Sequence, residues 1–174
     1  MRHLIAAAAL ASALLLPGSD AGAASATPEF TRRDPAGWLN SEPLTLAGLR
    51  GKVVLIEFWT YGCINCRRTL PWLKTMHARY LKDGLVIVSV HTPEFDHERD
   101  VAKVREAVDR LEVEYPVMLD PDYAYWRALG NRYWPAFYLV GRDGRIRATA
   151  IGELHEGTAR GDDFESRIRK LIAG

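Results

Sequence analysis

Two stretches of almost uninterrupted apolar residues constrain the fold of this chain most strongly. Residues 53–59 (VVLIEFW) and 85–91 (LVIVSVH) are short and rich in β-branched side chains. Such runs are typical of strands buried on both faces, as in a parallel sheet covered by helices. The apolar residues between them, over about 63–82, suit a helix, and Gly84 ends that segment. The order strand, helix, strand predicts an α/β fold.

The second half of the chain adds further elements to this unit. Apolar spacing and turn signals predict helices over 97–111 and about 162–172, a short helix starting at Asp120-Pro121, and strands over 136–140 and 145–151 around a hairpin turn. The expected order is therefore β-α-β-α-(α)-β-β-α. The sequence contains no internal repeat that would indicate a repeat protein.

The N-terminal segment has the three parts of a secretory signal. Residues 1–3 are a short basic start, residues 4–16 are uncharged and mostly apolar, and Ala24-Ser25-Ala26 is an A-x-A cleavage site. An uncleaved membrane anchor is the alternative, although this apolar stretch is short for a membrane span. We expect the protein in the periplasm or elsewhere outside the cytoplasm, where disulfides persist. The expected division is a signal peptide over 1–26, an irregular lead-in over 27–43 and a single domain over 44–174.

The charge balance and the cysteine count exclude several classes of protein. The chain has 23 Lys and Arg against 22 Asp and Glu, a formal charge of +1, whereas a nucleic-acid-binding protein needs a basic field. Its two cysteines, Cys63 and Cys66, cannot form a four-cysteine zinc site or an iron–sulfur cluster. We therefore expect a monomer with no nucleic-acid partner, no metal and no dissociable cofactor.

The two cysteines stand three residues apart, directly after a predicted strand and at the start of a predicted helix. The free N–H groups and the dipole of a helix N-terminus stabilise a thiolate, so the pKa of Cys63 should lie below that of a free thiol. The thiolate is the species that attacks a disulfide. Cys66, one turn further into the helix, is expected to be more buried and to resolve the resulting mixed disulfide.

Structural and metal-binding roles fit this Cys-x-x-Cys pair less well. A structural disulfide would gain little from closing so short a loop. Haem attachment requires a histidine directly after the second cysteine, where this chain has Arg67. Zinc needs four ligands, and the histidines show no ligand spacing relative to the pair: His77, His91, His97 and His155.

Glu57 lies six residues before Cys63, in the middle of the apolar run over 53–59. A buried carboxylate is costly unless it is paired or protonated, and burial raises its pKa. Such a group suits a base that takes a proton from Cys66 through water. The alternative is a glutamate on a solvated strand edge or in a structural ion pair.

Aromatic residues flank both the cysteine pair and a late proline. Trp59 and Tyr61 precede the first cysteine, and Trp134-Pro135 precedes a late predicted strand. These four residues are candidates for substrate contact, because aromatic side chains are enriched at recognition surfaces. For Trp59 and Tyr61 the alternative is a position in the core. A cis Trp134–Pro135 bond would turn the backbone of Trp134 outward, where an extended substrate could pair with it as an added strand. An ordinary trans proline at a strand start is the alternative.

The segment from Glu57 to Cys66 (EFWTYGCINC), with Pro71 in the helix and Trp134-Pro135 before the hairpin, resembles the thioredoxin superfamily. The long stretch from Thr92 to Tyr133 resembles the extracytoplasmic TlpA/ResA-type, or redoxin, branch. The segments FWTYGCINCRRTLPWL, VHTPEF, YPVMLD and NRYWPAFYLV are similar to the thioredoxin-like domain of DipZ-type proteins. The resemblance covers about residues 44–172.

This resemblance implies a thioredoxin-like fold: a central mixed β-sheet flanked by helices, with an insertion between the β-α-β half and the C-terminal β-hairpin-α half. It also implies that Pro135 is cis and faces the cysteines. DipZ-type proteins carry in addition a membrane electron-transfer domain, which this sequence does not include. A membrane thiol-electron carrier is therefore an expected partner. The two residues between the cysteines are Ile and Asn, whereas thioredoxin has Gly and Pro. The redox potential of thioredoxin therefore cannot be assumed for this protein.

Together these features predict an extracytoplasmic thiol–disulfide oxidoreductase that exchanges disulfides with protein substrates through a redox-active Cys63–Cys66 disulfide, in the direction of reduction. The alternatives are a disulfide-forming oxidase, a thiol peroxidase and a redox-inactive binding module. For the peroxidase, Thr60 stands three residues before Cys63, as in peroxide-reducing redoxins, but the proline of their P-x-x-x-T-x-x-C pattern is absent. Copper-carrying proteins of this fold use a three-residue spacer, which is absent too.

Overall fold

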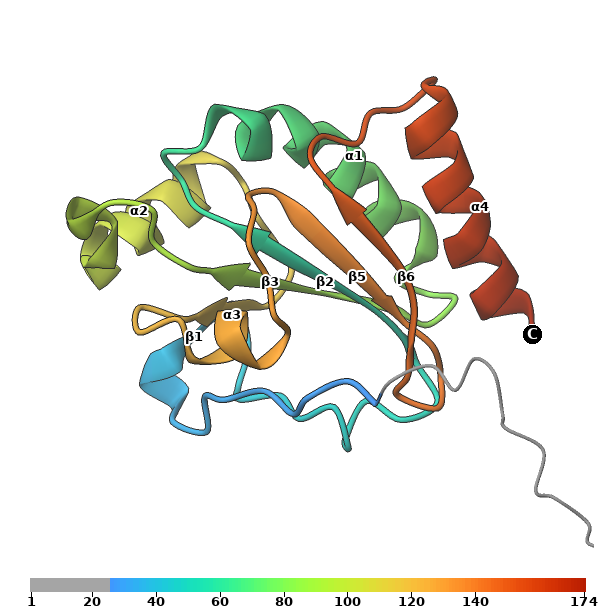
Figure 1. Ribbon diagram of the computed structural model, residues 1–174, viewed down its shortest axis with the longest axis horizontal. Coiled ribbons are helices and arrows are strands. Elements are labelled where there is room, and N and C mark those ends of the chain that lie inside the picture. Colours follow the sequence, from blue (N-terminus) through green and yellow to red (C-terminus); the bar gives the residue numbers. More distant parts are fainter. Residues whose placement is uncertain (1–25) are drawn as a thin grey trace, which may run out of the picture.

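The computed structural model describes residues 26–174, so the expected signal peptide lies, except for its last residue, outside the described residues. A six-stranded mixed sheet forms the centre, in the order β1-β4-β3-β2-β5-β6 (Figure 1). β2, β3 and β4 run parallel, whereas β1, β5 and β6 each pair antiparallel with their neighbours. The strands are β1 (Trp38–Leu39), β2 (Val53–Trp59), β3 (Leu85–His91), β4 (Val117–Leu119), β5 (Ala136–Val140) and β6 (Ile146–Ile151).

The two apolar runs form the central strands of this sheet, as predicted. β2 pairs with β3 in parallel from Val53 opposite Leu85 to Trp59 opposite His91. Every residue of β2 is buried, because helices or loops cover both faces of the sheet. A continuous apolar run is what such a position requires, since neither face meets water.

Each face of the sheet is covered by its own set of elements (Figure 1). On one face, Leu55 of β2 packs in a core with Leu73, Val104 and Phe164, which come from three different helices. On the other face, Phe58 packs with the N-terminal segment and one short helix. The helices of the first face are α1 (Ile64–Tyr80), α2 (Val101–Arg110) and α4 (Ala159–Ala173), and the short helix is α3 (Ala124–Ala128).

The lead-in over 27–43 is more ordered than the sequence indicated. It contains a 3-10 turn, η1 (Pro35–Gly37), and strand β1, which pairs antiparallel with β4. Phe30 and Trp38 are almost fully buried and pack against each other in the core of the second face. The folded unit therefore begins before residue 44. The two-residue strand and the three-residue β4 were not predicted, because segments this short carry too little periodicity to be recognised.

Two predicted helix starts were wrong. Asp120-Pro121 does not begin a helix; α3 begins at Ala124, and the Asp120 carboxylate accepts hydrogen bonds from the backbone N–H groups of Tyr125 and Trp126 at 3.0 and 2.9 Å. The predicted helix over 97–111 is divided into a 3-10 turn, η2 (Asp96–Arg99), and α2. The division occurs because Asp100, in extended conformation, is the N-cap of α2.

Among residues 26–174, no helix combines the length and apolar character needed to cross a membrane.

Candidate active site at the start of α1

The cysteine pair lies where the chain leaves β2 and enters α1. Cys63 is the N-cap of α1, and its Sγ accepts a hydrogen bond from the backbone N–H of Cys66 at 3.2 Å. Cys63 is half-buried, whereas Cys66 has no exposed surface. Both are free thiols in this structure. The expected arrangement of one accessible thiol above one buried thiol is therefore present.

The surroundings separate the pKa values of the two thiols. The pKa of Cys63 is lowered from 9.0 to about 7, chiefly because the Cys66 thiol donates a hydrogen bond to its sulfur, and further because the N–H groups of Cys66 and Asn65 do so. The pKa of Cys66 is raised, because burial disfavours its charged form and because its proton is held by Cys63. Cys63 is thus the thiol that ionises more readily at neutral pH, whereas Cys66 holds its proton.

Glu57 occupies the predicted interior position, and it is fully buried in β2. Its Oε2 accepts a hydrogen bond from the hydroxyl of Ser89, which stands directly opposite on β3. Burial raises the pKa of Glu57 to about 8; the Ser89 hydrogen bond opposes this shift and the charge of Cys63 adds to it. Glu57 therefore does not lie on a solvated strand edge, because its strand is buried and has a neighbour on each side. The carboxyl can therefore exchange a proton at a pH close to neutral.

Trp134 and Pro135 lie at the same end of the sheet as the cysteines. Ala136 pairs with Phe58 near the end of β2, so the residues before β5 stand beside the loop that leads to Cys63. The Trp134–Pro135 peptide bond is cis, as the resemblance implied. Pro135 is buried and Trp134 half-buried, with its indole N–H donating to the carbonyl of Thr92 at 3.0 Å.

The aromatic pair before the cysteines divides into one core residue and one surface residue. Trp59 is only 1% exposed and lies on the sheet face that α1 covers, so it is a core residue, as the alternative prediction had it, and not a substrate contact. Tyr61 is partly exposed, and its ring stacks on that of His91 at 5.7 Å between centroids. Tyr61 remains a candidate for substrate contact.

The sequence did not reveal a carboxylate that holds the loop before Cys63. Glu98 is 1% exposed and comes from η2, in the insertion. Its carboxylate accepts the backbone N–H of Gly62 at 3.0 Å and the N–H groups of Glu94 and Phe95 at 2.6 and 3.0 Å. Hydrogen bonds from these amides lower the pKa of Glu98 although burial opposes them. Its position 36 residues after Gly62 gave no local signal.

The contact between Glu98 and Gly62 can be tested by adding a side chain at Gly62. A Cβ added there would overlap Oε1 of Glu98, and the carboxylate cannot swing away without losing hydrogen bonds to Gly62 through Oε1 and to Glu94 and Phe95 through Oε2. We expect Gly62→Ala to lower the free energy of unfolding by about 1–3 kcal/mol, as overpacking does. Urea denaturation measures this loss. In a Glu98→Ala background the same substitution should cost much less, and an equal cost in both backgrounds would contradict the assignment.

Within residues 26–174, no three His, Cys, Asp or Glu side chains gather closely enough to hold a metal ion. The site is thus built from two thiols, a buried carboxyl and the surrounding backbone.

Comparisons with known proteins agree with this geometry. The Redoxin family profile matches residues 22–166. Protein DipZ of Mycobacterium bovis is 44% identical over 120 residues, which cover 67% of this chain and 17% of DipZ. Thiol-disulfide oxidoreductase YkuV of Bacillus subtilis is 28% identical over 136 residues, covering 78% of this chain and 88% of YkuV.

The fold agrees as well. The crystal structure of the thioredoxin domain of a thiol-disulfide oxidoreductase from Bacteroides vulgatus superposes with a TM-score of 0.67 at 22% identity, covering 88% of this chain and 99% of that one. The mixed sheet and the helices on both faces are thus those of a thioredoxin-like fold, as the sequence resemblance implied. With a family match that extends over most of its length, this chain belongs to the Redoxin family.

Proposed function

We propose that this protein is an extracytoplasmic thiol–disulfide oxidoreductase that reduces disulfides in protein substrates. The observation that carries the proposal is the pairing of an accessible, low-pKa Cys63 with a buried, high-pKa Cys66 at one helix start. Two thiols arranged in this way suit a sequential exchange, because only one is reactive until a mixed disulfide forms. A redox-inactive binding module would have no need of this arrangement.

The proposed reaction has two steps. The Cys63 thiolate attacks a substrate disulfide, forms a mixed disulfide and releases the first substrate thiolate. Cys66 then gives its proton to Glu57, through water, and its thiolate attacks the Cys63 sulfur. The Cys63–Cys66 disulfide forms and the second substrate thiolate leaves, so two electrons pass from the pair to the substrate. A membrane thiol-electron carrier on the outer side of the cytoplasmic membrane would return the two electrons.

Substrate binding is assigned to the segment before β5. Within the described residues, the backbone N–H and C=O of Trp134 make no hydrogen bond. An extended substrate segment could therefore pair with Trp134 while its disulfide approaches Cys63. Tyr61 would border the same surface. These contacts bind backbone rather than particular side chains, which suits an enzyme acting on several protein substrates.

Peroxide reduction is disfavoured by the position of Thr60. In the peroxidase pattern this threonine serves the reactive cysteine, but here it is fully buried and its hydroxyl lies 3.3 Å from Nε2 of His91. Burial lowers the pKa of His91 to about 4, so this neighbour is a neutral ring at physiological pH. The Thr60 hydroxyl is thus buried beside His91.

The direction of electron flow is tested by equilibrating the protein with glutathione. A reductase should hold its pair as the disulfide in mixtures where glutathione is largely reduced, because its dithiol is the stronger reductant. Mass spectrometry after acid quenching and alkylation gives the fraction oxidised. A pair that stays as dithiol in strongly oxidising mixtures would instead identify an oxidase. Rapid turnover of hydrogen peroxide by the purified protein would favour the peroxidase.

A further inference from the structure

The proposed base Glu57 has no contact with solvent, yet it can take the proton of Cys66 only after it has lost its own. Its carboxyl is fully buried, beneath α1 and between β3 and β5. On the cysteine side, a bound substrate would cover the accessible thiol while Glu57 still has to become ionised. A proton that left by that side would have to wait for the substrate to depart. An exit elsewhere would remove this delay.

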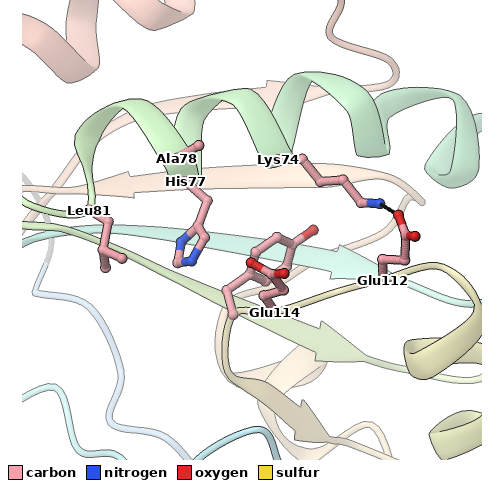
Figure 2. Close-up of a pocket in the computed structure, with 7 residues that line it drawn as sticks. Lys74, His77, Ala78, Leu81, Glu112 and Glu114 are labelled. Carbon is pink, nitrogen blue, oxygen red and sulfur yellow. Dashed lines mark hydrogen bonds and ion pairs between the residues drawn. The ribbon is translucent and has the colours of Figure 1, made fainter.

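A pocket of about 510 Å³ lies between α1 and the segment that leads into β4 (Figure 2). Lys74 and Glu112 form an ion pair of 3.0 Å across it, and His77 extends from α1 into it, as Figure 2 shows. Tyr115 also lines the pocket, and its ring lies 5.5 Å from that of His77 between centroids. The pocket is polar enough to hold water.

Tyr115 connects this pocket to the buried carboxyl. Tyr115 is 1% exposed. Pro116, which follows it in the chain, accepts a hydrogen bond at its carbonyl from the backbone N–H of Ser89 at 2.9 Å. The Tyr115 hydroxyl is close enough to Glu57 and Ser89 for both to affect its pKa, which burial raises well above 10. This hydroxyl therefore stays neutral and can both accept and donate a proton.

Three polar atoms along this line are buried and have no hydrogen-bond partner within residues 26–174: Oε1 of Glu57, the hydroxyl oxygen of Tyr115 and Nδ1 of His77. Unpaired polar atoms in a protein interior are rare, and ordered water or a change of hydrogen bonding usually accounts for them. Tyr115 and His77 both line the pocket with their rings 5.5 Å apart, and the charge of Glu57 acts on the Tyr115 hydroxyl. The other titratable groups that face Glu57 are Cys63 and Cys66, and those at the pocket are Lys74, Glu112 and Glu114.

We infer that Glu57 exchanges its proton with solvent through Tyr115 and the pocket beside His77, and not through the cysteine face. This inference rests on the proposed role of Glu57 as base. In the transfer, the Glu57 proton passes to the Tyr115 oxygen while the Tyr115 hydroxyl proton passes to water or to Nδ1 of His77. The tyrosine is unchanged at the end, and one proton has moved from the carboxyl to the pocket. Tyr115 and His77 are positioning residues that act through Glu57.

The test measures how fast Glu57 changes protonation after a rapid pH jump from 6 to 9. Time-resolved infrared spectroscopy of the full chain follows the carboxylic acid band that is absent in Glu57→Gln. Tyr115→Phe removes the proposed relay hydroxyl. Tyr125→Phe is the matched control, because this tyrosine is also buried but lies on the opposite face of the sheet. Wild-type protein alkylated at Cys63 with N-ethylmaleimide has its cysteine face blocked.

We expect the exchange rate to fall at least tenfold in Tyr115→Phe and to stay within twofold of wild type in Tyr125→Phe and in the alkylated protein. A wild-type rate in Tyr115→Phe, or a slow rate in the alkylated protein, would overturn the inference. The titration midpoint comes from the same spectra, so a changed pKa is separated from a changed rate. Failure of the proposed function would appear differently, as undiminished disulfide exchange by Glu57→Gln.

Discussion

Replacement of Cys66 by alanine is expected to turn the catalyst into a trap for its substrates. Cys63 would still attack a disulfide, but no internal thiol could resolve the product, so multiple-turnover reduction should fall by at least about a thousandfold. Disulfide-linked adducts should accumulate on Cys63. Non-reducing gels and mass spectrometry of the variant expressed with a signal for export would detect them.

The same variant has a second expected property. The Cys66 thiol is the largest contributor to the lowered pKa of Cys63, so without it this pKa should rise from about 7 toward 9.0. The pH dependence of Cys63 alkylation by iodoacetamide measures the change. Cys63→Ser is the matched control and should form no adducts. Adducts with Cys63→Ser, or undiminished turnover by Cys66→Ala, would contradict the assignment of nucleophile and resolving thiol.

Replacement of Glu57 by glutamine is expected to stabilise the protein at alkaline pH. The pKa of Glu57 is raised in the folded state from 4.5 to about 8, so the unfolded state holds the charged form more easily. The folded protein therefore loses stability as the pH rises from about 4.5 to about 8, and the loss is complete above that range. Such a shift corresponds to a cost on the order of 3–5 kcal/mol above about pH 8, which glutamine does not incur.

Urea denaturation between pH 4 and 9 measures this difference. The variant should be more stable than wild type at pH 8.5 and should lose that advantage below about pH 5. Glu98→Gln is the contrasting control: the pKa of Glu98 is lowered by its amide partners, so its charge stabilises the folded state at neutral pH and the substitution should destabilise it. A stability of Glu57→Gln equal to that of wild type at pH 8.5 would show that the carboxyl is not buried as described.

Glu57→Gln should also separate stability from activity. A neutral amide cannot take the proton of Cys66, so resolution of the mixed disulfide should slow. The free energy of unfolding at alkaline pH should nevertheless increase. This combination is expected at catalytic groups, where a buried charge is retained for chemistry at the expense of stability.

The fold could be predicted best where the sequence pattern was long. Residues 53–59 and 85–91 formed central strands because a strand buried on both faces must be apolar throughout. β1 and β4 could not be predicted, because a strand of two or three residues is stabilised by its neighbours in the sheet rather than by its own composition. The insertion was recognised as a segment, but its helix boundaries depended on capping contacts at Asp100 and Asp120.

At the site, local contacts were predictable and distant ones were not. The N-cap position of Cys63 follows from a strand, a break at Gly62 and a helix in immediate succession. The interior position of Glu57 follows from its apolar neighbours. For Trp59 the sequence left a core position and substrate contact open, and the structure decided for the core because both faces of β2 are covered.

The sequence by itself determined the placement of the reactive groups: two thiols at one helix start and an acid six residues before the first of them. These depend on residues close together along the chain, where backbone geometry limits the outcomes. Only the tertiary structure decided which groups surround that chemistry. Glu98 accepts a hydrogen bond from Gly62, and the charge of Glu57 acts on the Tyr115 hydroxyl, because sheet pairing and the insertion bring distant parts of the chain together. Such contacts carry no local pattern, so the physical tuning of the cysteines could be seen only in the folded molecule.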